Sequence, residues 1–352
     1  MQKFMVGGAV RDKLMGLEPK DVDFVVVGST PEAMLAAGFQ QVGADFPVFL
    51  DKDGVEHALA RTERKSGHGY NGFVTDHSAD VKLEDDLMRR DLTVNAMAMS
   101  GNFVVDPFGG QEDMKNKVLR HVSPAFADDP VRVLRLARFH ARFGPEWLVH
   151  TDTVLFARKM AAEGELKHLT RERVLKELEK ALGEPHPKLF FDTLKLCNAL
   201  EEVLPEVAAV HDKVDFVLVR FPHVSAKFKY ASISKHMKDA DAFETRLNVS
   251  TEWRKFAKMY RNLFRPDVPQ PTAVDSLYAI DAYRQADLFE ELVEDFRKTD
   301  ALKYFQFFVD AFEKTRHVSF ASLTPEQQAT LKGPAIAEAI KAHRIALLEQ
   351  PE

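Results

Sequence analysis

Two aspartates separated by one residue stand at the start of an apolar run and could hold a divalent metal. Asp21 and Asp23 lead directly into the run Phe24 to Val27. If this run is a β-strand, the two side chains point to one face, because side chains alternate along a strand. Two carboxylates supply hard oxygen ligands for Mg²⁺, and substrate phosphates can complete its shell. The spacing predicts a metal site, although a lone Asp-x-Asp is more often a solvated strand end.

A glycine pair upstream of the aspartates predicts a turn that can approach a phosphate. Gly7 and Gly8 follow a short apolar run and precede a helix start, and Arg11 adds a positive charge. Glycine lets backbone amides come close to a ligand, and amides at a helix start favour anions. A lone glycine pair is usually only a turn. In this order and spacing, the glycine turn, the arginine and the aspartate pair favour nucleotidyl transfer.

Two further motifs carry side chains suited to a nucleotide. Arg90 could contact a triphosphate, Asp91 a ribose hydroxyl, and Asn95 the sugar or the backbone. Arg–Asp pairs in helices are more often structural, so Arg90, Asp91 and Asn95 are by themselves weak evidence for a nucleotide site.

The second motif begins at Asp129 and Arg132. Asp129 and Arg132 are three residues apart and can lie side by side on one helix face. Aspartate accepts from an exocyclic amine while arginine donates to a ring acceptor, which matches the base edges of cytosine and adenine. Arg135 and Arg138 continue at the same spacing and could hold phosphates. The alternative is a solvated, arginine-rich helix with internal ion pairs, although the intervening apolar residues indicate packing.

The chain divides into three parts, whose helices and strands must position these residues. Strand-like runs and helical patches alternate over residues 1–125, which predicts an α/β head. The pattern becomes helical from Asp128, where an aspartate cap and a proline mark a helix start. We predict a head over 1–125, a helical neck with the nucleotide template over 126–205, and a helical body and tail over 206–352.

Composition narrows the class of protein. The chain has 352 residues, a net charge of −6 and one cysteine, Cys197. This cysteine count excludes a disulfide framework and a cysteine-based zinc site. We recognise no signal peptide and no apolar run long enough to span a membrane, so we expect a soluble cytoplasmic protein. Residues 220–265 nevertheless hold eleven Lys and Arg against four Asp and Glu, which predicts either a phosphate-binding face or a solvated helix face.

Taken together in this order, the motifs resemble those of the class II bacterial CCA-adding enzymes, the tRNA nucleotidyltransferases, and most closely the gammaproteobacterial kind. The resemblance is strong over residues 1–205. It rests on Val6 to Asp12, Lys20 to Asp23, Thr62 to Gly67, Arg89 to Thr93, and Asp129 to Arg132 with Arg135 and Arg138.

The resemblance implies a polymerase-β-like nucleotidyltransferase head followed by an all-α neck, body and tail. It implies that Asp21 and Asp23 are catalytic metal ligands and that Asp129 and Arg132 form a protein template for C and A. It further implies a set of nucleotide contacts that consists of Gly8, Arg11, Arg90, Arg135 and Arg138. The glycine-rich loop between Arg61 and Phe73 is assigned to the switch between adding C and adding A; the alternative is a plain exposed loop.

Two departures from the family are visible. Asp128 stands where the template motif usually has glutamate, and we expect little effect. The gammaproteobacterial members also carry a C-terminal HD phosphohydrolase domain, whose His-Asp pair is replaced here by the segment Ser232 to Lys238. His211-Asp212 has no further His or Asp at workable spacing, and we interpret it as chance. The C-terminal half is predicted to be a degenerate, HD-like body that has lost its metal site.

We therefore predict a Mg²⁺-dependent enzyme that adds and repairs the 3′-terminal CCA of tRNA from CTP and ATP without a nucleic acid template. A poly(A) polymerase, or an enzyme that adds only A or only C, shares the head motifs and remains an alternative. A non-catalytic RNA-binding relative is a third hypothesis, against which the intact Asp21 and Asp23 argue.

Overall fold

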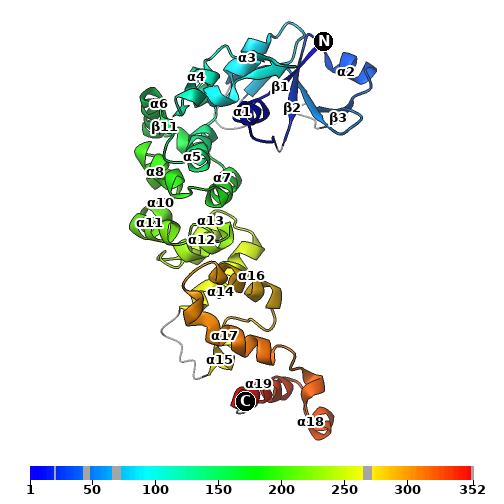
Figure 1. Ribbon diagram of the computed structural model, residues 1–352, viewed down its shortest axis with the longest axis vertical. Coiled ribbons are helices and arrows are strands. Elements are labelled where there is room, and N and C mark those ends of the chain that lie inside the picture. Colours follow the sequence, from blue (N-terminus) through cyan, green and yellow to red (C-terminus); the bar gives the residue numbers. More distant parts are fainter. Residues whose placement is uncertain (20, 43–47, 66–72, 265–271, 350–352) are drawn as a thin grey trace. The chain divides into compact units, whose positions relative to one another are not determined.

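The computed structural model describes residues 1–352 except 20, 43–47, 66–72, 265–271 and 350–352. The chain forms two compact units, Met1–Ala208 and Ala209–Glu352. The first contains a β-sheet and helices and the second is built of helices (Figure 1), which confirms the predicted fold class. The division into head, neck and body at residues 125 and 205 stays a prediction.

A seven-stranded mixed sheet forms the head of the first unit, with the order β3-β4-β5-β2-β1-β8-β9. The central strand β2 pairs antiparallel with β1 and parallel with β5. The strands are β1 Gln2–Val6, β2 Asp23–Val27, β3 Gln40–Val42, β4 Val48–Leu50, β5 Glu56–Leu59, β8 Ala98–Ser100 and β9 Phe103–Val105.

The apolar run in β2 is explained by burial on both faces of the sheet. Val25 packs in one core cluster with Val6 and Leu87, while Val26 packs in another with Met34 and other residues. A strand covered on both sides needs no polar alternation, so it appears as a continuous run of valines. The covering helices of the head are α1 Gly8–Leu14, α2 Pro31–Ala36, α3 Leu83–Met88 and α4 Gly110–Lys115.

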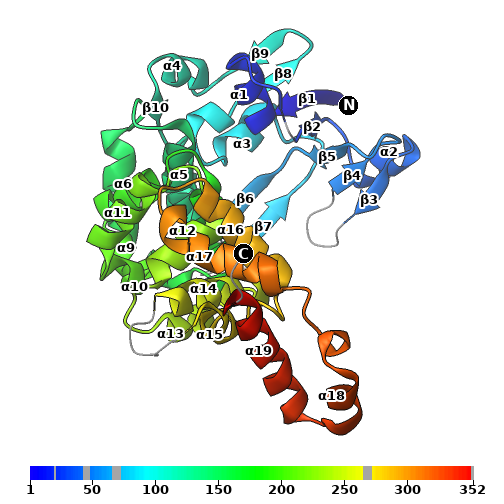
Figure 2. The ribbon, with the colours of Figure 1, turned by 60° about the horizontal axis from the view of Figure 1, so that its bottom comes forward.

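A second, two-stranded antiparallel sheet consists of β6 Thr62–Lys65 and β7 Phe73–Asp76. Figure 2 shows this pair apart from the strands of the large sheet. The glycine-rich loop between Arg61 and Phe73, which was predicted to switch between adding C and adding A, falls largely between these strands. Its residues 66–72 lie outside the described part of the chain.

Helices complete the first unit after the sheet. They are α5 Val131–Phe143, α6 Thr151–Ala162, α7 Arg171–Gly183, α8 Lys188–Leu196, α9 Leu200–Val203 and α10 Pro205–Ala208. Helix α5 packs against both α7 and α8, and its residues Leu134, Ala137 and Ala141 are fully buried. Two short strands, β10 Val118–Leu119 and β11 Leu148–Val149, pair in parallel beside them. The strand β11 departs from the purely helical pattern expected after Asp128.

The second unit is made of helices around an aromatic core. They are α11 His211–Arg220, α12 Ala226–Ser234, α13 Ala240–Arg246, α14 Thr251–Leu263, α15 Ala273–Ala279, α16 Ala286–Arg297, α17 Leu302–Thr315, α18 Pro325–Thr330 and α19 Pro334–Glu349. Phe228 lies edge-on to both Tyr260 and Phe296, with ring centroids 5.1 Å apart in each case. None of the described helices combines the length and the apolar character that crossing a bilayer requires.

The segment that replaces the expected His-Asp pair takes part in this packing. Ser232 and Ser234 on α12 are both 1% exposed. Ser234 accepts a hydrogen bond from Arg261 at 3.1 Å, and the Lys235 ammonium lies 3.7 Å from the centroid of the Phe264 ring. These positions therefore contribute to the core and its edge. One helical turn along α11, Asp215 Oδ1 lies 4.0 Å from His211 Nδ1. The expectation that His211 has no further Asp at workable spacing is therefore wrong.

Candidate active site

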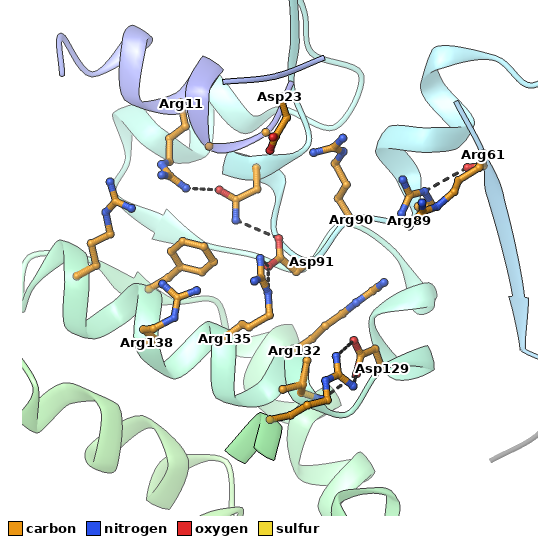
Figure 3. A pocket seen from close by; sticks show the side chains of 17 residues that line it. Arg11, Asp23, Arg61, Arg89, Arg90, Asp91, Asp129, Arg132, Arg135 and Arg138 are labelled. Atoms are coloured by element: carbon orange, nitrogen blue, oxygen red, sulfur yellow. Dashed lines mark hydrogen bonds and ion pairs between the residues drawn. The ribbon is translucent and has the colours of Figure 1, made fainter. Parts of the chain in front are cut away.

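The predicted site residues other than Asp21 line one cavity of about 520 Å³ in the first unit. Among the described residues, nine arginines and three aspartates line it, so its lining carries a strong excess of positive charge. The lining consists of Gly7, Gly8, Arg11, Asp23, Arg61, Arg89, Arg90, Asp91, Asn95, Asp129, Val131, Arg132, Arg135, Arg138, Phe139, Arg142 and Arg173. Figure 3 shows their side chains converging from the head and from α5. Such a cavity suits a triphosphate, whose negative charge needs several guanidinium partners.

The glycine turn lies where the sequence predicted it, between β1 and α1. Gly7 caps α1 with a φ of 69°, a backbone conformation that favours glycine. A Cβ at Gly7 would also lie 2.7 Å from Nη1 of Arg90. The positive φ therefore favours glycine at this position, and a larger residue would also displace the end of the Arg90 side chain.

Asp23 lines the cavity, but Asp21 does not. Strand β2 begins at Asp23, and Asp21 lies exposed in a bend two residues earlier. The expectation that both aspartates share a strand face is therefore wrong, because the strand does not reach Asp21. Among the described residues, Asp91 and Asp129 are bound by arginines, whereas Asp23 forms no hydrogen bond or ion pair. Its carboxylate in a cationic cavity fits a ligand for a divalent metal.

Arg11 is buried and belongs to a network that joins α1 to α5. It donates to Asp12 Oδ1 through Nε at 2.9 Å and Nη2 at 2.7 Å, and through Nη1 to Asn95. Arg142 of α5 donates to the other oxygen of Asp12 at 3.0 Å. Burial lowers the pKa of Arg11, and the charge of Asp12 opposes this shift. Arg142 was missed by the sequence analysis, although it continues the arginine series of the same helix.

Asp91 is also bound by partners from within the protein. Its Oδ2 accepts from Arg135 Nε at 2.8 Å, and its Oδ1 accepts from the Leu92 amide at 2.8 Å and from Asn95 at 3.0 Å. Burial by itself would raise the pKa of Asp91, but the charge of Arg135 and the hydrogen bonds from Asn95, Arg135 and the Leu92 amide together outweigh it and hold this pKa well below its usual range. Asp91 thus stays ionised and fixes Arg135, which is a more direct role than the expected contact with a ribose hydroxyl.

The predicted template residues line the cavity from the segment before α5 and its first turn. Helix α5 begins at Val131, so Asp129 precedes the helix in an extended conformation. The expectation that Asp129 and Arg132 share a helix face is therefore wrong. They nevertheless stay within one turn, because the Arg132 amide donates to the Asp129 carbonyl at 3.0 Å. Arg132 also donates through Nη1 to the Ala125 carbonyl at 2.7 Å.

A residue that the sequence analysis missed orients Asp129. Arg173 on α7 donates Nη1 and Nη2 to the two carboxylate oxygens of Asp129, at 2.8 and 2.6 Å. This bidentate geometry fixes the plane of the carboxylate. One turn later on the same helix, Glu177 is buried and accepts from Arg138 Nε at 2.6 Å. Arg173 and Glu177 stand at i and i+4 on an otherwise apolar face of α7, and this pattern in the sequence could have indicated their role.

Replacing Glu177 by alanine is expected to destabilise the first unit by about 3–5 kcal/mol, because it leaves a buried guanidinium without its main partner. Arg138 is 7% exposed and also lies 3.5 Å from a Glu184 oxygen and over the ring of Phe139. Thermal or denaturant unfolding measures the effect. The exposed Glu172 on the same helix forms an ion pair with its neighbour Arg171, and Glu172→Ala serves as the control. Equal stability of the two variants would show that Glu177 does not stabilise Arg138.

Comparisons with known proteins place the chain in a family. Residues 3–120 match the family described as "Poly A polymerase head domain", and residues 149–210 match "Probable RNA and SrmB- binding site of polymerase A". The CCA-adding enzyme of Pseudomonas putida is 41% identical, and the alignment covers 99% of both chains. The multifunctional CCA protein of Hahella chejuensis is 56% identical over 60% of this chain, a match that spans half of that relative's length.

Solved structures agree in fold. A CCA-adding enzyme in its apo form II matches 99% of this chain and 88% of its own, with a TM-score of 0.66 and 22% identity. The Thermotoga maritima CCA-adding enzyme, solved with tRNA, matches 99% and 88%, with a TM-score of 0.65 and 22% identity. The sheet, the cationic cavity and the head-domain match together define the nucleotidyltransferase class, whose members use a divalent metal. The full-length relatives then settle the family: this chain belongs to the CCA-adding enzymes, which are tRNA nucleotidyltransferases.

Proposed function

We propose that the cavity catalyses the addition of C, C and A to the 3′ end of tRNA from CTP and ATP. The observation that supports this most directly is the single cavity in which Asp23 lies among nine arginines, beside the pair Asp129 and Arg132. The 3′-hydroxyl of the tRNA attacks the α-phosphate of the bound nucleotide, the bond to the β-phosphate breaks, and pyrophosphate leaves. The cytoplasmic location expected from the sequence stays a prediction.

In this proposal Asp23, together with Asp21, holds Mg²⁺. When bound, the metal supplies electrophilic stabilisation of the charge that develops on the transferred phosphate. Gly8, Arg11, Arg90, Arg135 and Arg138 are the proposed nucleotide contacts. Because Arg11, Arg135 and Arg138 are bound by Asp12, Asp91 and Glu177, their guanidinium groups are oriented before the nucleotide arrives. Such preorganisation is the main way in which a protein accelerates phosphoryl transfer.

The choice of C and A is assigned to Asp129 and Arg132. Asp129 Oδ1 accepts from Arg173 and from the Val131 amide at 3.1 Å, whereas Oδ2 accepts from Arg173. A carboxylate oxygen has two lone pairs, so Oδ2 can still accept from the amine of a base. Arg132 carries five N–H donors on its guanidinium group, and its Nη1 donates to the Ala125 carbonyl. Cytosine and adenine present an amine beside an acceptor, whereas uracil and guanine do not. Asp91 stays the proposed contact for a ribose hydroxyl, which would have to compete with the donors that Asp91 already has in Arg135, Leu92 and Asn95.

Purified protein, a tRNA that lacks its CCA end, and each nucleoside triphosphate in turn test the proposal. We expect incorporation of CTP first and of ATP after two C additions, with Mg²⁺ required. Long runs of A without a requirement for C would instead identify a poly(A) polymerase. Incorporation of only one nucleotide would identify a partial enzyme.

Exposed lysines on α14 are expected to contribute to the binding of tRNA. Of the basic residues between 220 and 264, Lys227 and Arg261 form ion pairs and Lys229 is buried, whereas Lys255 and Lys258 are exposed. The double variant Lys255→Ala/Lys258→Ala should weaken tRNA binding and lower its salt dependence, because each phosphate contact releases about one counterion.

Binding measured across a salt series checks this, with Lys52→Ala/Lys115→Ala as a control of equal charge change on the first unit. Equal affinity and an equal slope for wild type and the α14 variant would remove α14 from the tRNA-binding surface.

The second unit is expected to have no phosphohydrolase activity. Such a site needs several imidazole and carboxylate groups around a transition metal, and the segment Ser232 to Lys238 packs against the core and its edge. Hydrolysis of 2′,3′-cyclic AMP with Ni²⁺, Mn²⁺ or Co²⁺ added is the measurement. Metal-stimulated hydrolysis that disappears in His211→Ala would show that a working site exists at His211.

A further inference from the structure

One carboxylate outside the cavity binds three of the arginine residues that line it. Asp86 on α3 is fully buried. Its Oδ1 accepts from the Arg61 amide at 3.3 Å and from Arg89, through Nε at 3.1 Å and Nη2 at 2.6 Å. Its Oδ2 accepts from Nη2 of Arg90 at 3.2 Å. A single buried charge therefore contacts two arginine side chains and one arginine main chain at the edge of the site.

Through these contacts Asp86 fixes the start of the β6–β7 pair. Arg89 donates a second hydrogen bond from Nε to the Arg61 carbonyl at 3.2 Å, so both the amide and the carbonyl of Arg61 are held. Arg61 immediately precedes β6, which begins at Thr62. Figure 3 shows Arg61 and Arg89 together at one end of the cavity.

Asp86 also sets the direction of Arg90. The Nη1 atom of Arg90 lies so close to Gly7 that a Cβ there would come within 2.7 Å. The Nε atom of Arg90 is buried and has no hydrogen-bond partner among the described residues. The ion pair between Arg90 Nη2 and Asp86 therefore holds the guanidinium group in place. In Figure 3 the guanidinium of Arg90 lies between Asp23 and the Arg61–Arg89 pair. It thus faces the position where the triphosphate and the metal meet in the proposed function.

The carboxylate of Asp86 is ionised in this environment. Burial would raise its pKa, but the charges of Arg89 and Arg90 and the hydrogen bonds that they donate together outweigh the burial and lower this pKa. Ionisation matters because a neutral acid or amide could not hold two guanidinium groups with the same strength. The positions of Arg89 and Arg90 therefore depend on the charge of Asp86 as well as on the shape of its side chain.

We propose that Asp86 is a positioning residue for nucleotide transfer, which aims Arg90 at the triphosphate and ties Arg90 to Arg61, the residue before β6. The inference rests on the proposed function, because Arg90 is there assigned to the nucleotide. In this proposal Asp86 touches neither substrate nor metal and acts through Arg90. Loss of Asp86 should therefore lower kcat/KM and nucleotide affinity more than it lowers the stability of the fold.

Asp86→Asn keeps the shape of the side chain and removes its charge. We expect kcat/KM for CTP and for ATP to fall by about 10- to 100-fold, because small misplacements of a binding group have effects of this size. Equilibrium binding of CTP in the presence of Mg²⁺ and without tRNA should weaken in parallel. Asp86→Glu, which keeps the charge but moves the carboxylate by one methylene, provides a second variant with the same expected direction.

Asp113→Asn is the matched control for the loss of a buried charge. Asp113 is 5% exposed, binds Arg120 and Thr93, and does not line the cavity. We expect both asparagine variants to lower the melting temperature, but only Asp86→Asn to lower kcat/KM and CTP affinity. The double variant Asp86→Asn/Arg90→Ala should be no worse than Arg90→Ala alone, because the two residues act in series.

The outcomes separate the inference from the function on which it rests. Equal kcat/KM for Asp86→Asn and Asp113→Asn, with the wild type active, would overturn the inference and leave the proposed function intact. Additive losses in the double variant would show that Asp86 does not act through Arg90. A wild-type protein that incorporates no nucleotide would overturn the proposed function itself.

Discussion

Asp23→Ala is expected to reduce nucleotide incorporation by more than about 100-fold, because outer-shell partners of a metal alone typically cost 10- to 100-fold. Asp23 stands at the first residue of β2, lines the cavity, and forms no ion pair with another described residue. Its side chain is exposed, so its loss should leave the fold intact. Single-turnover incorporation of CTP into a tRNA that lacks CCA, at saturating Mg²⁺, measures the effect.

Asp21→Ala tests the second proposed ligand in the same assay. Asp21 lies in the bend before β2, outside the cavity lining, and we expect a loss as large as that for Asp23 if it completes the metal site. Asp53→Ala removes an exposed carboxylate elsewhere on the head and is the control. Near-wild-type turnover of a folded Asp23 or Asp21 variant would remove that residue from the metal site.

Asp129→Ala should erode the preference for CTP and ATP over UTP and GTP. A lost base contact typically costs about 1–3 kcal/mol of discrimination, or roughly 5- to 150-fold in the ratio of incorporation rates. Arg132→Ala should act in the same direction, because the two residues read neighbouring groups on the base edge. Incorporation of the four triphosphates, measured side by side, gives the selectivity. Unchanged selectivity in both variants would refute the template assignment.

Arg173→Ala extends this test to the residue that orients Asp129. Both carboxylate oxygens of Asp129 are bound by Arg173, so its loss should reduce selectivity without removing a base contact. Arg171→Ala is the matched control, since Arg171 is an exposed arginine on the same helix that pairs with Glu172. If the two arginine variants kept the same selectivity, the orientation of Asp129 would not depend on Arg173.

Much of the fold could be predicted because its signals are local. The valine run of β2 and the helical spacing from Leu134 to Ala141 each reflect the period of one element and the side that it buries. The ends of elements were less predictable, since they depend on hydrogen bonds that neighbouring segments compete for. Asp21 and Asp129 fell just outside their expected strand and helix for this reason.

By itself, the sequence predicted most of the residues that line the cavity. Gly7, Gly8, Asp23 and Arg90 belong to short motifs whose internal spacing is set by a single turn or strand, so they can be recognised without knowing the fold. The family also followed from these motifs, and the full-length relatives confirm it.

The tertiary structure alone decided which partners orient those residues. Arg142 reaches Asp12 across 130 positions of the chain, Arg173 reaches Asp129 across 44, and Glu177 reaches Arg138 across 39. A charged residue on a helix has many candidate partners in the sequence, and packing of α1, α5 and α7 around the cavity selects one of them. Burial then stabilises the selected pairing, because removing one partner of a buried ion pair leaves an unpaired charge away from water.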